Sequence, residues 1–267
     1  LISSAGISAS EPMAFATVEG QRLEIERIAG MRVGAPALVF LHEGLGSVAL
    51  WRDFPAKLAA RTGASALVYS RRGYGKSDRL AAPRKPDYMH HEALMVLPAL
   101  LSELGIAEPI LVGHSDGASI ALIHAGSRRW PVRALVLEAP HVFVEDVTVA
   151  SIEQARDAYR TTDLPSRLAR HHDDPDHAFW GWNDIWLDPA FRSWNIKEYL
   201  SSVRSPVLAI QGADDEYGTL AQLDAIERGV SGPLERLVLA SCKHSPHRDQ
   251  EGQTLDAMAG FVERISG

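Results

Sequence analysis

The chain has 267 residues, 46% of them hydrophobic and 23% charged, an ordinary balance for a globular protein with one large α/β domain or two small ones. Its net charge of −7, without any stripe of lysine and arginine, argues against non-specific binding to nucleic acid. The single cysteine, Cys242, excludes a disulfide within the chain and a cysteine-based zinc site, and no apolar run reaches the roughly 20 residues that cross a membrane.

The first ten residues lack the basic start of a signal peptide. We expect an artificial remnant or a floppy extension there, and an upstream targeting segment stays open. Apolar and polar residues then alternate over residues 17–28 around Glu19-Gly20, which predicts an antiparallel hairpin at the edge of a sheet. A continuous apolar run predicts a buried strand at residues 37–41, and further mainly apolar segments predict buried strands at residues 64–69, 109–112, 134–137, 206–210 and 234–239.

Helices are predicted from about Trp51, over residues 88–104, after Ser115 and over about residues 253–265. Because strands alternate with helices, we expect a mainly parallel sheet with helices on both faces.

The alternation breaks from about residue 141 to residue 200, where no buried strand is predicted and four of the six tryptophans cluster. An insertion of this length predicts a helical cap over the carboxyl edge of the sheet, where open α/β folds bind ligands. The polar run His171–His177 carries three histidines without a recognisable ligand spacing, so we expect a solvated surface rather than a metal site.

The stretch Gly113-His114-Ser115-Asp116-Gly117 lies between a predicted strand and a predicted helix, and it fits the G-x-S-x-G nucleophile elbow. Such a turn strains its central residue, and side chains at the flanking glycines would collide. Ser115 would present its hydroxyl at the top of the sheet, beside unpaired N–H groups of a helix N-terminus. A purely structural turn also fits this pattern. His114 is expected to point away from Ser115 and to serve as a packing residue.

Five motifs follow one another in a family order. They are an oxyanion loop (His42–Ser47), a D-x-R-G-x-G-x-S loop (Ser70–Asp78), the elbow (Gly113–Gly117), a G-x-x-D acid loop (Gln211–Asp215) and a histidine loop (Lys243–Pro246). With this set the chain resembles the α/β-hydrolase superfamily from about Thr17 onward. Three positions depart from the usual pattern: Ser70 replaces an aspartate, and Glu43 and Lys243 replace glycines.

The resemblance implies an α/β-hydrolase fold. This fold has a mostly parallel central sheet of about eight strands, helices on both faces and a helical cap inserted after the sixth strand. Residues 1–140 and 201–267 would form the core domain, and residues 141–200 the cap.

A serine hydroxyl is a poor nucleophile at neutral pH, so it needs a base to take its proton and an acid to orient that base. Of the 11 histidines, His244 is our candidate base, because it follows the last predicted strand and precedes Ser245-Pro246. His247 is the runner-up.

The family spacing, counted from Gly212, selects Asp215 as the acid. Asp214 is the alternative and is otherwise expected to face outward or to cap the following turn. Glu138 is a third candidate, since some superfamily members place the acid after that strand. Otherwise it is a polar residue at a strand terminus.

The oxyanion of the reaction needs fixed donors. In this fold one donor is the backbone N–H after the nucleophile, here Asp116, and the resemblance assigns the second to the N–H of Gly44, with Leu45 as the alternative. A carboxylate beside this hole would oppose catalysis. We therefore expect Glu43 to point away and bond within its loop, and the Asp116 side chain to cap the helix.

These residues predict a serine hydrolase that cleaves a carboxylic ester, or a thioester or lactone, through an acyl-enzyme intermediate, with no metal or organic cofactor. Trp180, Trp182 and Trp186 are the predicted substrate-binding residues of the cap. The expected partner is a small-molecule ester in the cytoplasm, with no nucleic acid and no membrane, and a homodimer is left open.

Three rival functions stay open. A hydrolase of carbon–carbon bonds in ring-fission products would need a basic group in the cap, such as Arg167 or Arg192. The others are a cofactor-free perhydrolase and a non-catalytic ligand-binding protein on the same fold. Ser115 at the nucleophile position disfavours epoxide hydrolases and haloalkane dehalogenases, which use an aspartate.

Overall fold

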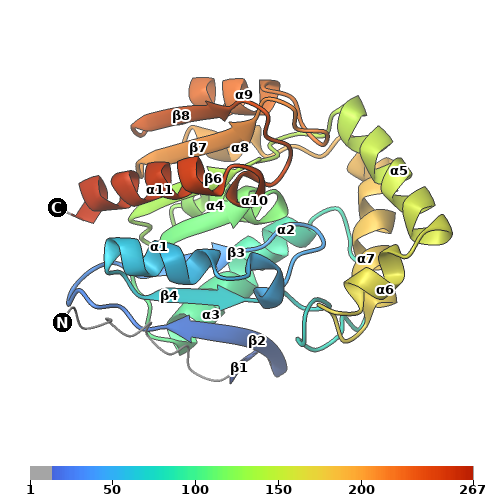
Figure 1. Cartoon of the computed structure of the whole chain (residues 1–267), viewed down its shortest axis with the longest axis horizontal. Helices are drawn as coiled ribbons and strands as arrows, with labels where there is room; N and C mark the ends of the chain where they lie inside the picture. Colours follow the sequence, from blue (N-terminus) through green and yellow to red (C-terminus); the bar gives the residue numbers. More distant parts are fainter. Residues whose placement is uncertain (1–13, 267) are drawn as a thin grey trace, which may run out of the picture.

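One eight-stranded sheet organises the molecule, with the strand order β1-β2-β4-β3-β5-β6-β7-β8 (Figure 1). This computed structural model describes residues 14–266, so the expectation for the first ten residues lies outside the described part. The strands are β1 (Ala14–Val18), β2 (Gln21–Ile28), β3 (Leu38–Leu41), β4 (Ala66–Tyr69), β5 (Ile110–His114), β6 (Ala134–Glu138), β7 (Val207–Gly212) and β8 (Leu234–Leu239).

The predicted hairpin is confirmed: β1 and β2 pair antiparallel, with Val18 opposite Gln21 across the turn at Glu19-Gly20. Strand β2 is also antiparallel to β4, and all other neighbours are parallel. Strand β8 departs from the expected buried strand, because it lies at the sheet edge and Val238 is 39% exposed.

Helices cover both faces, which confirms the predicted layers (Figure 1). Leu38 and Phe40 of β3 belong to one core cluster with α1 (Phe54–Thr62) and α11 (Glu251–Ser266). Val39 and Leu41 belong to the other, with α3 (Leu97–Glu103) and α4 (Asp116–Ser127). Alternation along a strand therefore divides the core in two.

The single helix expected over residues 88–104 is interrupted. It consists of α2 (Tyr88–His91), a π-helical turn η2 (Glu92–Val96) and α3. Pro98 explains the break, because it has no N–H to donate and its ring would clash with the carbonyl of Leu94 in a regular α-helix. Gly105 ends the segment with a φ of +69°.

The chain between β6 and β7 is helical, as the absence of strand signals predicted. Its elements are α5 (Asp146–Thr161), α6 (Leu164–Leu168), α7 (Pro175–Leu187), a 3₁₀ turn η3 (Pro189–Phe191) and α8 (Lys197–Leu200). Helices α5, α6 and α7 stand together at one end of the sheet (Figure 1). Whether this segment acts as a cap stays a prediction.

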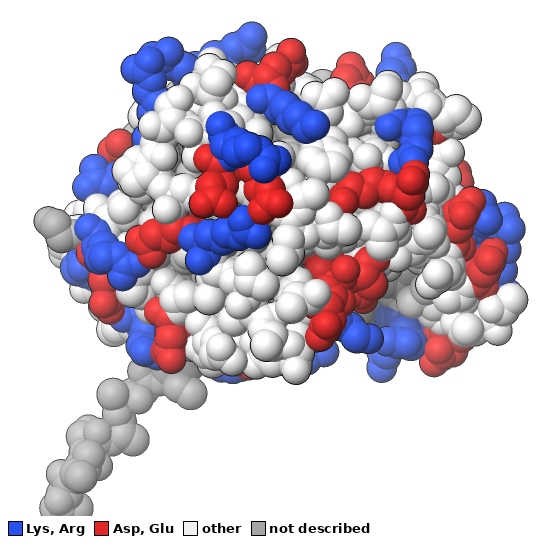
Figure 2. Space-filling model, turned by 90° about the horizontal axis from the view of Figure 1, so that it is seen from above, with Lys and Arg blue, Asp and Glu red and all other residues white. Residues whose placement is uncertain are grey.

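Basic and acidic side chains alternate over the face seen from above, with no large patch of one sign (Figure 2). A short run, η1 (Val48–Trp51), and the helices α9 (Ala221–Gly229) and α10 (Pro246–Asp249) complete the elements. Within residues 14–266 no helix is both long and apolar enough to cross a bilayer.

Candidate active site

Ser115 occupies the sharp turn between β5 and α4. Its backbone has φ +53° and ψ −115°, a conformation that L-residues rarely adopt. A Cβ added at Gly113 would lie 2.5 Å from the carbonyl of Gly117, and one at Gly117 would lie 2.0 Å from the carbonyl oxygen of Leu41. Glycine is therefore required at both flanking positions.

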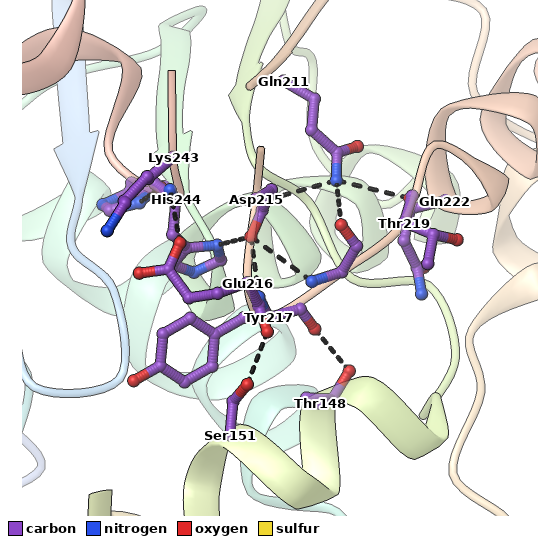
Figure 3. Close-up of polar contacts among 12 residues, drawn as sticks. Thr148, Ser151, Gln211, Asp215, Glu216, Tyr217, Thr219, Gln222, Lys243 and His244 are labelled. Atoms are coloured by element: carbon purple, nitrogen blue, oxygen red, sulfur yellow. Dashed lines mark hydrogen bonds and ion pairs between the residues drawn. The ribbon is translucent and has the colours of Figure 1, made fainter. Parts of the chain in front are cut away.

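Asp215 follows β7 and His244 follows β8 along the chain, and their side chains point toward each other (Figure 3). The Nδ1 atom of His244 lies 2.8 Å from Oδ1 of Asp215, and the carboxylate also accepts from the N–H of Tyr217 at 2.9 Å. Burial alone would raise the pKa of Asp215, but the hydrogen bonds from His244 and Tyr217 lower it below its usual value. Asp214 is exposed, as expected.

The acid loop is fastened to α5. The hydroxyl of Thr148 donates to the carbonyl of Tyr217, and the hydroxyl of Ser151 donates to that of Glu216 (Figure 3). The N-terminal half of α5 thus supports the loop that carries Asp215.

Ser115 and His244 line one cavity of about 130 Å³, together with Gly44 and Asp116. The described residues contain no hydrogen bond between the Ser115 hydroxyl and His244. Such contacts often tighten only when substrate binds. The cavity thus brings the predicted nucleophile, base and oxyanion loop together.

His141, which the sequence reasoning missed, lines the same cavity and is 2% exposed. Its ring centre lies 5.6 Å from that of His244, and its Nδ1 atom is buried without a partner. Burial and then the neighbouring His244 lower the pKa of His141 to about 4, so it is neutral at pH 7. The available signal was its place just after β6, at the carboxyl edge of the sheet.

The residues expected to form the oxyanion hole flank this cavity. Gly44 lies so close to the indole of Trp182 that an added Cβ would be 2.1 Å from its Nε1 atom. The carboxylate of Asp116 does not cap α4 as expected. Instead it accepts from the hydroxyl of Tyr88 at 2.7 Å and lies 3.4 Å from Nη1 of Arg71, because the carboxylate is buried and needs these partners.

His114 is more than the packing residue that was expected. Its Nε2 atom lies 2.7 Å from the carbonyl oxygen of His244, and its Nδ1 atom lies 3.4 Å from the Glu43 carboxylate. Although burial lowers the pKa of His114, the Glu43 carboxylate raises it overall. Glu43 therefore finds its partners outside its own loop, in His114 and in Arg248 at 3.9 Å.

The runner-up base and the third acid candidate pair with each other. Nδ1 of His247 lies 2.8 Å from Oε2 of Glu138, and both side chains are buried. Neither lines the cavity beside Ser115. The pair therefore links α10 to the end of β6, which is a structural role.

The three tryptophans predicted to bind substrate do not all lie at the cavity. Trp182 and Trp186, four residues apart on α7, line the cavity, whereas Trp180 does not. Trp180 faces another side of α7, where its ring packs on Tyr159 and lies 5.3 Å below the guanidinium of Arg160. The structure therefore does not support a pocket role for Trp180.

The cap arginines weighed for a second carboxylate lie elsewhere. Arg167 is exposed, and Arg192 pairs with Asp146 near the surface. Neither lines the cavity beside Ser115.

His172 departs from the solvated surface expected for the polar run. It is 4% exposed, its Nδ1 atom accepts from the N–H of Gly75 at 2.9 Å, and its Nε2 atom lies 3.0 Å from the carbonyl oxygen of Leu45. It thus ties the helical segment to two core loops. No cluster of three or more metal-ligating side chains occurs in the described part of the chain.

The departure at Ser70 is compensated from β2. The Ser70 hydroxyl donates to the Glu24 carboxylate at 2.6 Å, and that carboxylate also accepts from the N–H of Lys76 at 3.0 Å. Glu24 thereby supplies this loop with the carboxylate that its own sequence lacks.

A sequence-family model of the alpha/beta hydrolase fold matches residues 36–185, more than half of the chain. The chain belongs to the α/β-hydrolase family. This hydrolase is 34% identical over 102 residues to the sn-1-specific diacylglycerol lipase ABHD11 of Mus musculus, and 35% identical over 108 residues to Epoxide hydrolase 2 of Siraitia grosvenorii. These matches cover 38% and 40% of the hydrolase, and it spans about a third of each relative's length.

Solved structures agree on the fold. A proline iminopeptidase of Mycobacterium smegmatis superposes on the hydrolase with a TM-score of 0.77 at 18% identity, covering 95% of this chain and 98% of that one. The enol-lactonase from Burkholderia xenovorans LB400 gives 0.73 at 20% identity, covering 93% and 99%. At these identities the likeness concerns the fold alone.

Proposed function

We propose that the chain is a serine hydrolase that cleaves a carboxylic ester through an acyl-enzyme intermediate. The observation that carries the proposal is the 2.8 Å contact between His244 and Asp215 at the cavity that holds the strained Ser115. The similarity to a diacylglycerol lipase supports an ester as the substrate, and a thioester or lactone would use the same chemistry.

In the first half-reaction the Ser115 oxygen attacks the ester carbonyl while Nε2 of His244 takes the hydroxyl proton. Asp215 accepts the Nδ1–H, which fixes the tautomer and stabilises the imidazolium. The N–H groups of Gly44 and Asp116 hold the oxyanion. His244 then gives its proton to the leaving alcohol, and the acyl group remains on Ser115.

In the second half-reaction His244 takes a proton from water, and the resulting hydroxide attacks the acyl-enzyme. Collapse of this intermediate releases the acid and returns the proton to Ser115. No step draws on a group outside the chain except water.

The cavity also bears on the size of the substrate. A volume of about 130 Å³, walled by Trp182, Trp186 and Ile152, suits a small apolar acyl group. Residues 141–200 would act as the cap that shapes this space.

Carbon–carbon hydrolysis and epoxide opening receive less support. Carbon–carbon hydrolysis loses the basic group expected from Arg167 or Arg192, and the serine at position 115 argues against epoxide opening despite the similarity to an epoxide hydrolase. Ligand binding without turnover would be unaffected by Ser115→Ala.

The test is hydrolysis of p-nitrophenyl acetate, butyrate and octanoate by the wild type and by Ser115→Ala. We expect turnover of the shorter esters and its loss in the variant. Absence of turnover in the wild type, or unchanged turnover in Ser115→Ala, would refute the proposal.

A further inference from the structure

A buried arginine, Arg71, lies directly behind the proposed oxyanion hole. It follows β4 and its side chain is 3% exposed. It occupies an unspecified position of the D-x-R-G-x-G-x-S loop, so the motif itself does not select it. A guanidinium buried this deeply needs partners for its N–H groups, and those partners indicate what it holds in place.

Arg71 holds the peptide group that joins Glu43 to Gly44. Its Nη2 atom donates to the carbonyl oxygen of Glu43 at 2.8 Å and to that of His42 at 3.3 Å. The Glu43 oxygen and the Gly44 N–H belong to one peptide plane, which is trans, as are all peptide bonds of the described residues. In a trans peptide the C=O and N–H point in opposite directions, so the contact turns the Gly44 N–H away from Arg71.

The cation has a second effect on the same peptide group. A hydrogen bond from a charged donor to a carbonyl polarises the amide and makes its N–H a stronger donor. The backbone N–H of Arg71 also donates to Nε2 of His42 at 3.0 Å, which fixes the loop from a further side.

The same guanidinium reaches the residue that carries the other donor. Its Nη1 atom lies 3.4 Å from Oδ2 of Asp116, which also accepts from the hydroxyl of Tyr88 at 2.7 Å. Asp116 is 1% exposed. Arg71 and Tyr88 thus hold its carboxylate and offset the negative charge that would otherwise oppose an oxyanion at the neighbouring N–H.

We propose that Arg71 is a positioning residue that orients both oxyanion donors, Gly44 through the oxygen of its peptide group and Asp116 through its side chain. This inference rests on the ester-hydrolase function proposed above. It adds a residue that touches neither the substrate nor the triad, yet sets the strength of the anion hole.

The first experiment compares Arg71→Met, Arg71→Lys and the matched control Arg72→Met. Arg72, in the same loop, pairs with Glu19 at 2.9 Å and has no contact with the oxyanion loop among the hydrogen bonds of the described residues. Steady-state rates on p-nitrophenyl butyrate are corrected for active sites by titrating Ser115 to completion with a fluorophosphonate.

We expect kcat of Arg71→Met to fall by about 10²-fold, the loss typical of removing one oxyanion donor, with KM nearly unchanged. Arg71→Lys keeps the charge without the planar fork and should recover part of kcat. Arg72→Met should retain the wild-type kcat. Equal kcat in wild type and Arg71→Met would overturn the proposal.

The second readout is the inhibition constant of butylboronic acid, whose tetrahedral adduct on Ser115 places an oxygen in the anion hole. For Arg71→Met this inhibition constant should rise by the same factor by which kcat/KM falls. A fall in kcat/KM with unchanged boronate affinity would instead assign Arg71 a role outside the hole. A wild type without ester turnover and without boronate binding would overturn the proposed function, and this inference with it.

Loss of Arg71 leaves Asp116 buried without its cation, so Arg71→Met is compared with Arg71→Met/Asp116→Asn, in which both charges are gone. The double variant keeps the backbone N–H of residue 116. It still lacks the hydrogen bond from Arg71 to the carbonyl oxygen of Glu43, so its kcat should stay low. Full recovery would show that Arg71 only neutralises Asp116. Tyr88→Phe removes one hydrogen bond to the Asp116 carboxylate and should lower kcat by a smaller factor. An unchanged kcat in Tyr88→Phe would contradict the proposal that the Asp116 side chain must be held in place.

Discussion

Ser115 shows how much of an active site a few residues can dictate. Its positive φ costs on the order of 1–3 kcal/mol and persists only because the surroundings enforce it. The close contacts around this turn require glycine at positions 113 and 117, and this glycine pattern made the elbow predictable from the sequence. No comparable pattern marks His141, because a lone histidine after a strand has many ordinary roles.

The choice between two adjacent aspartates is testable. Asp215→Asn should lower kcat by about 10³–10⁴-fold, because the amide no longer fixes the imidazole tautomer or stabilises its charge. Asp214→Asn is the matched control and should leave kcat unchanged, since Asp214 is exposed. Ester turnover at pH 7.5 measures kcat of both variants. A larger loss of kcat in Asp214→Asn than in Asp215→Asn would make Asp214 the acid that orients His244.

His141 should make the protein sensitive to acid. Burial and His244 lower its pKa to about 4, although Asp215 and Asp116 act in the opposite direction. Below its ordinary value of 6.5 the unfolded chain binds a proton at His141 that the folded chain excludes until about pH 4. The free energy of unfolding therefore falls as pH falls through this window, by roughly 2–4 kcal/mol from this group.

The measurement is urea unfolding of wild type and His141→Gln at pH 7, 5.5 and 4. The difference between the two free energies of unfolding should move in favour of the variant as pH falls. A pH-independent difference would mean that His141 is protonated in the folded state near its ordinary pKa.

At the scale of elements, the site depends on contacts between segments that are distant in sequence. The acid loop after β7 is held by α5, the histidine loop by His114 at the end of β5, and α10 by the buried pair of Glu138 and His247. Local patterns predicted most strands and helices. They could not predict these ties, because each tie depends on two elements that meet only in the folded chain.

The pair at the end of β6 should matter for stability rather than for chemistry. His247→Leu leaves Glu138 buried without its partner, which should lower the free energy of unfolding by about 3–5 kcal/mol. The kcat of the folded fraction should stay near wild type. His247→Leu/Glu138→Gln should regain part of the stability. A stable His247→Leu protein without activity would make His247 the base.

The tether between α5 and the acid loop gives a second test at this scale. Thr148→Val/Ser151→Ala removes two hydroxyl contacts, each worth about 1 kcal/mol. Amide hydrogen exchange in residues 213–219 should accelerate and kcat should fall several-fold, whereas Ser166→Ala, on the exposed side of α6, should change neither. Unchanged exchange would show that the loop holds its shape without α5.

At the scale of the whole molecule, the sequence predicted the parallel sheet, the edge hairpin and the segment between β6 and β7 because these depend on periodicity and length. It missed the exposure of β8, because the prediction followed the apolar residues of that segment and disregarded its charged Glu235 and Arg236, which are typical of an edge strand. It also missed the π-turn before Pro98. It also treated Trp180 like Trp182 and Trp186, although they lie on different faces of α7. Which face meets the core is decided by packing.

The central claim is that Ser115 becomes covalently acylated during turnover, and rapid-quench peptide mass spectrometry tests it directly. Wild-type protein mixed with p-nitrophenyl acetate and quenched in acid within one turnover should carry one acetyl group on the peptide containing Ser115, and Ser115→Ala should carry none. An acetyl group on another residue, or turnover in Ser115→Ala at the wild-type rate, would contradict the account.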